Sequence, residues 1–290
     1  MRSFKITHIR DYIALTKPGI VRGNVLVAIG GFFLASTIGV DWAILFAVTI
    51  GLTCVIASAC VVNNYFDRKI DAKMDRTKNR ALVTGSISSV SALWFACVLG
   101  GVGFGTLLKY TNFISFFWAV VGFISYTIAY TPLKKKTVFA TEIGSIPGGT
   151  PPIIGYTAVA GTFDQTALLL GLILIAWQMP HFFSISIFRK KEYRQASIPV
   201  RAIHDGSERT RTIIQIYVIA FSILCVLLFS TGVVGWSYLT IMSTLCGYWL
   251  FWALRPPKHN IENWAKGVFG ISLIVLLGFC IAISVGARLP

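Results

Sequence analysis

Long apolar stretches alternate with short polar segments along almost the whole chain. A helix needs about twenty predominantly apolar residues to cross the roughly 30 Å hydrocarbon layer of a bilayer. The pattern therefore predicts an all-α membrane protein with nine transmembrane helices. We expect them at residues 20–39, 42–62, 88–108, 112–131, 141–160, 165–187, 212–231, 237–254 and 265–286.

The composition agrees with a membrane protein. Of the 290 residues, 55% are hydrophobic and 13% are charged, and the mean hydropathy is +0.73. These values exclude an ordinary water-soluble domain of this length. No linker, low-complexity tract or soluble module interrupts the pattern, so we expect a single integral-membrane domain over residues 1–290. The polar and basic segment 1–20 does not resemble a removable signal peptide.

The distribution of charge predicts the orientation. A net charge of +15 is compatible with nucleic-acid binding, but alternating spans would place nearly all Lys and Arg on one side of the membrane. The other side receives only Lys109 and Arg288. Because cytoplasmic loops are enriched in basic residues, we expect the N-terminus and the long loops in the cytoplasm and the C-terminus outside. Membrane lipid is therefore an expected partner of the protein, and nucleic acid is not.

A polar ladder follows the second apolar stretch, and it is the strongest chemical signal in the chain. Its members recur at every fourth position: Asn63, Asp67, Asp71 and Asp75. In a helix, this spacing aligns the four side chains on one face. Like charges at that spacing repel each other, so an unliganded helix gains nothing from them. A solvated helix end beside the membrane would need only the basic residues.

Basic residues crowd around the polar ladder. They are Arg68, Lys69, Lys73, Arg76, Lys78 and Arg80. Magnesium commonly takes one or two protein carboxylates and completes its coordination with water and phosphate oxygens. Lys and Arg bind the remaining phosphate charge. The combination therefore predicts a site for Mg²⁺ together with a polyanion on the cytoplasmic side.

The fifth apolar stretch is rich in residues that disfavour helices. It reads GSIPGGTPPIIG at 144–155. Proline removes a backbone hydrogen bond and clashes with the preceding turn, so we expect this helix to break or kink. The irregularity fits either a cavity wall that admits a bulky ligand or a kink required by packing, and both interpretations stay open.

Five motifs in order resemble those of the UbiA-type intramembrane prenyltransferases, and more narrowly the heme O synthase (protoheme IX farnesyltransferase) branch of that family. The broader likeness rests on the N-x-x-x-D-x-x-x-D pattern at Asn63, Asp67 and Asp71. The narrower one rests on KPGIVRGN at 17–24, NNYFDRKIDAKMDRTKNRALVTG at 63–85, LKKKT at 133–137, GSIPGGTPPIIGY at 144–156 and WQMPHFFSISIFRKKEYRQASIPV at 177–200.

The resemblance implies transfer of a farnesyl group from farnesyl diphosphate to a vinyl group of heme B, with addition of water, to give heme O and diphosphate. Metal and fixed cations would stabilise the charge that develops on the leaving diphosphate. We expect the metal at Asn63, Asp67, Asp71 and, one turn further toward water, Asp75. The residues expected to act in catalysis are Asn63, Asp67, Asp71, Lys134 and Tyr193.

The remaining substrate contacts follow from the same resemblance. The diphosphate is expected to bind Asn24, Arg76, Lys78, Arg80 and Lys135. His181, near the cytoplasmic end of the sixth span, is expected to contact heme, and Arg194 is a candidate for the heme propionates. Aromatic residues near the same end would shield an allylic cation from water. The enzymes that use or modify heme O in the membrane are expected partners.

One loop departs from the broader family. Most UbiA-type enzymes carry a second Asp-rich motif after the sixth span, whereas this chain has only Glu192 beside Tyr193 in that loop. A second metal site held by carboxylates is therefore not expected there. The heme O synthase branch is similar to this chain in the same loop.

Three rival functions remain at this point. A UbiA-type transferase acting on an aromatic quinone precursor or a chlorin would share the metal site and differ in the loop 177–200. A transporter would fit the broken fifth span but would place its ionisable residues near the bilayer midplane. A heme-binding electron carrier would require paired histidines, and only His181 lies in a span.

Overall fold

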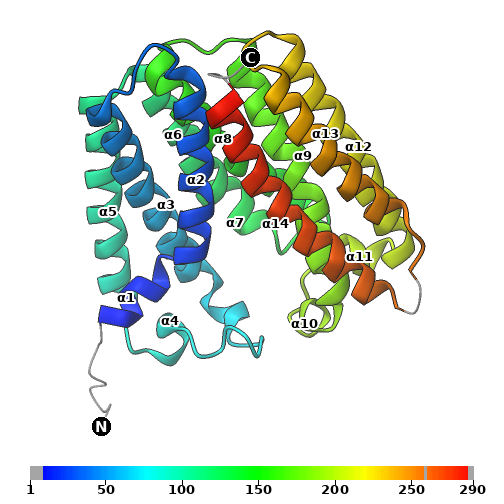
Figure 1. Ribbon diagram of the computed structural model, residues 1–290. Coiled ribbons are helices and arrows are strands. Elements are labelled where there is room, and N and C mark those ends of the chain that lie inside the picture. Colours follow the sequence, from blue (N-terminus) through cyan, green and yellow to red (C-terminus); the bar gives the residue numbers. More distant parts are fainter. Residues whose placement is uncertain (1–8, 258–259, 287–290) are drawn as a thin grey trace.

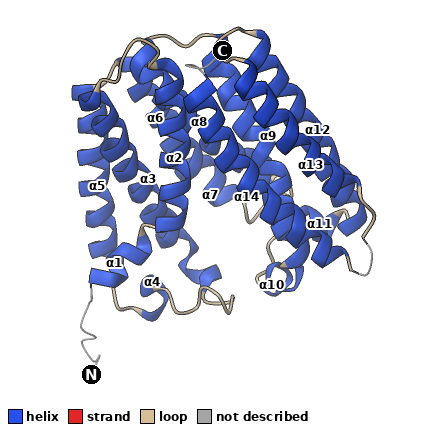
Figure 2. Cartoon of the chain, viewed as in Figure 1, coloured by secondary structure: helices blue, strands red, loops and turns tan. Residues whose placement is uncertain are grey.

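A computed structural model describes residues 9–257 and 260–286, and these form a helical bundle (Figures 1 and 2). The helices of the first half are α1 Ile9–Leu15, α2 Pro18–Ala35, α3 Trp42–Asp71, α4 Ala81–Thr84, α5 Ser89–Tyr110, α6 Phe113–Ile124, the π-helix η1 Ser125–Tyr130, α7 Thr131–Leu133 and α8 Ala140–Ala160. Those of the second half are α9 Gln165–Phe188, α10 Lys190–Gln195, α11 Arg201–His204, α12 Ser207–Ser230, α13 Trp236–Leu254 and α14 Ile261–Gly286.

The long helices pack in two groups. In the first, α2, α3, α5, α6 and α8 contact one another, and in the second, α9, α12, α13 and α14 do so. Contacts of α2 with α14 and of α8 with α9 join the two groups. The largest buried cluster lies mainly in the second group, where it includes Phe221, Trp249 and Phe279, and it extends into α2 and α8.

The short helices lie at one end of the bundle. Figure 1 shows α1, α4, α10 and α11 below the long helices, and the end of α14 at the opposite side. The connections at that opposite side are short, such as the turn that follows α8 at Gly161, where φ is +69°. The long polar segments, with most of the charged side chains, therefore lie at the end of the bundle that carries the short helices.

Membrane-spanning character is confirmed. Seven helices within the described ranges are long and apolar enough to cross a bilayer. They correspond to α2, α3, α5, the continuous run α6–η1–α7, α9, α12 and α14. The other two expected spans coincide with α8 and α13, which are also long helices. The protein is thus an all-α multi-pass membrane protein.

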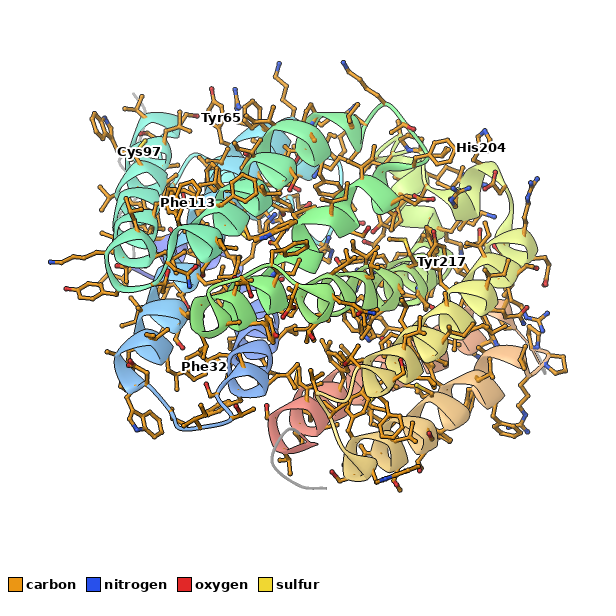
Figure 3. The ribbon with its side chains drawn as sticks, turned by 90° about the horizontal axis from the view of Figure 1, so that it is seen from above. Phe32, Tyr65, Cys97, Phe113, His204 and Tyr217 are labelled. Atoms are coloured by element: carbon orange, nitrogen blue, oxygen red, sulfur yellow. The ribbon has the colours of Figure 1, made fainter. Side chains whose placement is uncertain are left out.

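The outer surface of the bundle is apolar. Trp94, Phe113 and Phe251 are between 60 and 70% exposed, which suits contact with lipid chains. Figure 3, a view from above, shows side chains pointing outward around the bundle and Cys97 at its edge.

The fifth span was expected to break or kink, and the break is wrong, because α8 runs unbroken through Pro147, Pro151 and Pro152. Pro151 has no N–H to donate to the carbonyl oxygen of Pro147. The Thr150 hydroxyl donates to that oxygen instead, at 2.8 Å. The hydrogen bond that proline removes is thus replaced locally, and the helix continues.

The glycines of α8 serve close helix packing. A Cβ atom on Gly155 would lie 1.8 Å from the carbonyl oxygen of Ala28 in α2, and one on Gly31 would lie 2.3 Å from that of Pro152. The backbones of α2 and α8 therefore touch. Between the two interpretations of this segment, the packing one is supported along residues 149–158, which are buried.

Candidate functional site

The last three turns of α3 carry a buried polar face. Asn63, Asp67 and Asp71 are 0%, 3% and 5% exposed, and they lie on one face because they are four residues apart. The helix starts at an Asp41 cap, whose carboxylate accepts from the N–H groups of Ala43 and Ile44 at the far end of α3. The acidic residues thus extend from a membrane-spanning helix toward the end with the short helices.

Asp67 pairs with a lysine from a distant segment. The Lys134 ammonium, just after α7, donates to Asp67 Oδ2, and both side chains are largely buried. The second carboxylate oxygen, Oδ1, is buried and has no hydrogen-bond partner among the described residues. A buried anion requires compensation for each of its oxygens, so Oδ1 is a free ligand for a cation.

Asn63 connects three segments. Its Oδ1 accepts from the Lys17 ammonium, which precedes α2, and its Nδ2 donates to the Thr131 hydroxyl at 2.9 Å. Burial lowers the pKa of Lys17 to about 8, because desolvation disfavours the charged amine. The resulting group of Lys17, Asn63, Asp67, Thr131 and Lys134 is called the Asp67 cluster below.

Asp71 lies in a second, adjoining group. One Arg80 nitrogen donates to Asp71 Oδ2 at 2.7 Å and to Asn64 Oδ1 at 3.0 Å. Asn64 in turn donates to the carbonyl oxygen of Leu15 at 2.8 Å, which fixes α1 against α3. The Thr77 hydroxyl donates to the Asp71 carbonyl at 2.9 Å. These bonds fold the loop after α3 back onto the helix and bring Arg80 to the buried face.

The end of the polar ladder is exposed. Asp75 is 81% exposed and pairs with Lys78 at 2.8 Å, and the hydrogen bond from Lys78 lowers the pKa of Asp75. Arg76 is also exposed. Asp75, Arg76 and Lys78 thus lie at the mouth of the site, outside the buried cluster that Asn63, Asp67 and Asp71 form.

A π-helical turn presents the groups opposite α3. In η1, the backbone N–H of Thr131 bonds to the carbonyl oxygen of Tyr126. The rings of Tyr126 and Tyr130 stack with centroids 5.4 Å apart, and the Lys134 ammonium lies 5.8 Å from the Tyr130 centroid. Lys135 donates to the carbonyl oxygen of Phe66 at 3.3 Å. The aromatic rings of Tyr126 and Tyr130, together with Lys135, thus border the Asp67 cluster.

The residues of the loop 189–200 that were expected to act at the site differ in their surroundings. Burial raises the pKa of Tyr193, while the positive charges of Arg76 and Arg189 act to lower it. Basic residues from both halves of the bundle therefore influence Tyr193 electrostatically. Arg194 is exposed. Glu192 pairs with Arg189 at 3.1 Å.

No side-chain contact within the described residues joins Asn24 to the Asp67 cluster. It is half-buried on α2, and its Nδ2 donates to the carbonyl oxygen of Ile20 at 2.8 Å, one turn earlier in the same helix. Lys17 occupies the corresponding place beside Asn63.

His181 lies apart from the Asp67 cluster, at the contact between α9 and α14. Its Nδ1 is 2.8 Å from the Ser272 hydroxyl. The imidazole stacks on Trp177 at a centroid distance of 4.8 Å and contacts Phe269 at 4.7 Å. No contact joins His181 to the Asp67 cluster.

The residue pattern alone did not identify three further groups. Thr131 completes the Asp67 cluster, Ser272 holds His181, and Arg201 binds Glu142 and Asp205. The only sequence signals were weak: Thr131 precedes LKKKT, and Glu142 is one of few acidic residues in an apolar stretch. Thr131 lies 68 residues from Asn63, Ser272 lies 91 from His181 and Glu142 lies 59 from Arg201. Sequence spacing does not predict such contacts.

The donor set fits a magnesium ion. No group of three His, Cys, Asp or Glu side chains converges as a metal cage within residues 9–257 and 260–286. Magnesium does not require one, since it keeps water and phosphate oxygens and takes one or two carboxylates. Asp67 Oδ1, which has no partner in the described chain, is an oxygen that such an ion could take, and Asn63 and Asp71 offer further oxygens on the same helix face.

Comparison with protein families decides the relationship. The model of the UbiA prenyltransferase family matches residues 24–274. The chain belongs to the UbiA prenyltransferase family. This UbiA chain is also 40% identical to a protoheme IX farnesyltransferase from Marinomonas sp. over 278 residues, 95% of this chain and 94% of the relative. It is 42% identical to one from Sodalis glossinidius over 285 residues, 97% and 96% of the two chains. The resemblance to the heme O synthase branch is confirmed.

Solved structures confirm the UbiA-type fold. Digeranylgeranylglyceryl phosphate synthase matches with a TM-score of 0.80 and 19% identity, over 96% of this chain and 98% of that one. A UbiA homologue from Archaeoglobus fulgidus, bound to GPP and Mg²⁺, matches with a TM-score of 0.68 and 15% identity, over 94% and 99%.

Proposed function

We propose that this UbiA-family protein is a protoheme IX farnesyltransferase. It transfers the farnesyl group of farnesyl diphosphate to a vinyl group of heme B, and water supplies a hydroxyl group, giving heme O and diphosphate. The full-length similarity to proteins of that name supports the substrate pair. The observation that carries the chemistry is the buried Asp67 cluster, where a half-satisfied carboxylate lies among lysines.

Mg²⁺ is the metal that suits this site. Asp67 Oδ1, Asn63 and Asp71 would hold it, with Asp75 as a further ligand at the mouth. When bound, Mg²⁺ neutralises negative charge on the leaving diphosphate. The Archaeoglobus fulgidus homologue was solved with GPP and Mg²⁺ bound, which accords with this assignment.

Fixed cations bind the diphosphate. Lys134 is the most buried of the candidate lysines after α7 and directly faces Asp67. Lys135 and Arg80 border the same buried face. Arg76 and Lys78 lie at the mouth and attract the anion, and Asn24 would contact it only after a rotamer change. As the allylic carbon–oxygen bond breaks, these positive charges stabilise the oxygen that gains charge.

The farnesyl group needs a dry aromatic environment. Tyr126 and Tyr130 stack beside Lys134, and Tyr193 is half-buried in the loop after α9. Their ring faces stabilise positive charge on the allylic carbon and exclude water until the bond to the vinyl carbon has formed. After that bond forms, water adds to the neighbouring carbon and loses a proton.

Heme B would bind on the side of the second half of the bundle. His181 is the contact we assign to the porphyrin, because it is a polar group held between aromatic rings. Arg194 is exposed at the same end and is assigned to a propionate. Arg201 is less suited to that role, since Glu142 and Asp205 already bind it.

We further propose that all nine long helices cross the membrane as one domain over residues 1–290. Seven spans are found in the described chain, and α8 and α13 add two more helices of 21 and 19 residues, which is long enough to cross a bilayer.

We also propose that the protein lies in the bacterial inner membrane, because its relatives from Marinomonas and Sodalis are bacterial. The basic end would then be cytoplasmic and the end of α14 outside; residues 287–290 lie beyond the described range. Membrane enzymes that use or modify heme O are the expected partners.

The test uses purified protein in detergent with heme B, farnesyl diphosphate and Mg²⁺. Mass spectrometry should detect heme B that has gained a farnesyl and a hydroxyl group, and the product should vanish when EDTA removes the metal. Adding Mg²⁺ in excess over EDTA should restore product formation. Product formation that persists in EDTA would refute the metal assignment.

The same assay separates the rival functions. If heme B is inert and a hydroxybenzoate or a chlorin is prenylated, the acceptor assignment is wrong while the diphosphate site stands. If no acceptor reacts but proteoliposomes carry a solute across the bilayer, the protein is a transporter. The burial of Asp67 at one end of the bundle, away from the midplane, favours the enzyme.

A further inference from the structure

Ser272 has a geometry that determines the proton positions on His181. It is fully buried on α14, which packs along α9 (Figure 1). Its hydroxyl oxygen lies 2.6 Å from the carbonyl oxygen of Phe269 and 2.8 Å from His181 Nδ1. Two oxygens 2.6 Å apart repel each other unless a proton lies between them. The single hydroxyl proton of Ser272 is therefore committed to Phe269.

This commitment leaves only one arrangement for the imidazole. Because the Ser272 hydroxyl has no second proton, it can only accept from His181 Nδ1, and Nδ1 must carry a hydrogen. In the neutral imidazole, Nε2 then has a lone pair and no proton. Hydrogen bonding at one ring nitrogen thus sets the chemistry of the other, as it does for histidines that bind metals.

The ring is also fixed in orientation. Trp177, one turn before His181, stacks on the imidazole, and its indole N–H donates to the carbonyl oxygen of Ser272 at 2.7 Å. Phe269 contacts the imidazole at a centroid distance of 4.7 Å. Ser272 therefore holds the histidine through its hydroxyl and holds the stacking tryptophan through its carbonyl.

The free nitrogen is accessible. His181 Nε2 has no hydrogen bond within the described chain, and it is not among the buried polar atoms that lack a partner. A lone pair presented at an accessible surface among aromatic rings suits coordination of a metal ion at the centre of a flat, apolar ligand.

We propose that Ser272 is a positioning residue that presents His181 Nε2 as an axial ligand to the iron of the heme substrate. The inference rests on the proposed function for the identity of the ligand. Ser272 acts through His181 and does not itself touch the heme.

The test measures binding of ferric heme B to the full chain in detergent, without farnesyl diphosphate. We expect a Soret band that titrates to saturation in the unaltered protein. His181→Ala should lose the histidine-type spectrum, and added imidazole should restore it. Ser272→Ala should weaken binding about tenfold, as is usual when the partner of a metal-binding histidine is removed.

Two controls make the test specific. Ser284→Ala on the same helix removes a hydroxyl that donates to the carbonyl oxygen of Cys280, and it should leave heme binding unchanged. Protoporphyrin IX without iron cannot accept a nitrogen ligand, so Ser272→Ala should not weaken its binding. Equal weakening for heme and for the iron-free ring would mean that Ser272 only supports packing, and would overturn the proposal.

A measurement on the unaltered protein covers the case in which Ser272→Ala does not fold. Resonance Raman spectra of the dithionite-reduced heme complex should contain an iron–histidine stretching band that is absent from His181→Ala. Its absence from the unaltered protein would overturn the proposal.

The outcome is separable from that of the proposed function. If the unaltered protein makes heme O while His181→Ala keeps the same heme spectrum, the coordination proposal fails and the activity stands. If the histidine signature is present but no farnesylated product forms, the activity fails and the coordination stands.

Discussion

Asp67 divides its carboxylate between two environments: Oδ2 accepts from the Lys134 ammonium, and Oδ1 is buried with no hydrogen-bond partner in the described chain. A buried carboxylate with one oxygen unsatisfied is costly for stability. Such a cost at the end of a membrane-spanning helix indicates selection for binding, and in our proposal Mg²⁺ and a diphosphate provide the compensation.

Replacing the charge of Asp67 should therefore abolish most activity. Asp67→Asn keeps the shape but loses the anionic oxygen, and we expect kcat for farnesyl transfer to fall by about 100-fold or more. Product formation is measured by mass spectrometry at saturating Mg²⁺. The matched control is Asp41→Asn at the other end of α3, where Asn also caps a helix well. A similar loss in both variants would contradict the assignment.

The contact of α2 with α8 should tolerate no side chain at Gly155. Gly155→Ala would place a methyl group 1.8 Å from the carbonyl oxygen of Ala28, and we expect a loss of about 2 kcal/mol or more. Thermal unfolding in detergent measures it. Gly101→Ala, with no atom within 4 Å of the added carbon, should leave stability equal or slightly higher. Equal melting temperatures for the two variants would refute the close approach.

Substitutions of Arg201 and Glu142 should have non-additive effects on the free energy of unfolding, because the two side chains form an ion pair. Both side chains are more than three-quarters buried, and Glu142 Oε2 already lacks a partner. Arg201→Gln leaves an uncompensated carboxylate and should cost about 2 kcal/mol of unfolding free energy. The double variant Glu142→Gln/Arg201→Gln should lose less than the sum of the single variants. Additive losses would mean that the pair contributes nothing.

Acid should weaken the anchoring of α11 through Asp205. The hydrogen bond from His204, followed by that from Arg201, holds the pKa of Asp205 below its usual 3.8. The folded state therefore binds this proton less readily than the unfolded chain. The stabilisation is present above pH 3.8 and is lost as the pH falls through the folded pKa. Melting temperatures measured from about pH 5 downward should fall more steeply for the unaltered protein than for Asp205→Asn. Parallel curves would exclude this contribution.

Local regularities made much of the fold predictable. Apolar stretches of span length located the long helices, and the four-residue spacing placed Asn63, Asp67 and Asp71 on one buried face. The prediction of a break in α8 failed because the Thr150 hydroxyl replaces the hydrogen bond that Pro151 removes. That repair depends on one rotamer, and composition does not reveal it.

Site residues were predictable only where they share a segment. Lys134 was expected from its basic run, but its pairing with Asp67 joins residues 67 positions apart. Thr131 and Ser272 carry little sequence signal, since serine and threonine are frequent in membrane helices and usually bond to their own backbone. Asp75 continues the spacing of the polar ladder but lies in solvent, because α3 ends at Asp71.

The π-helical turn Ser125–Tyr130 makes the length of its span a functional property. A π turn holds one residue more than an α turn, so deletion of one residue there would leave a regular α-helix with the following segment still in phase. An insertion finds no such compensation and would rotate the following segment by about 100°. Thr131 and Lys134 would then turn away from Asn63 and Asp67, so an insertion probes this helix more sharply than a deletion or a point substitution.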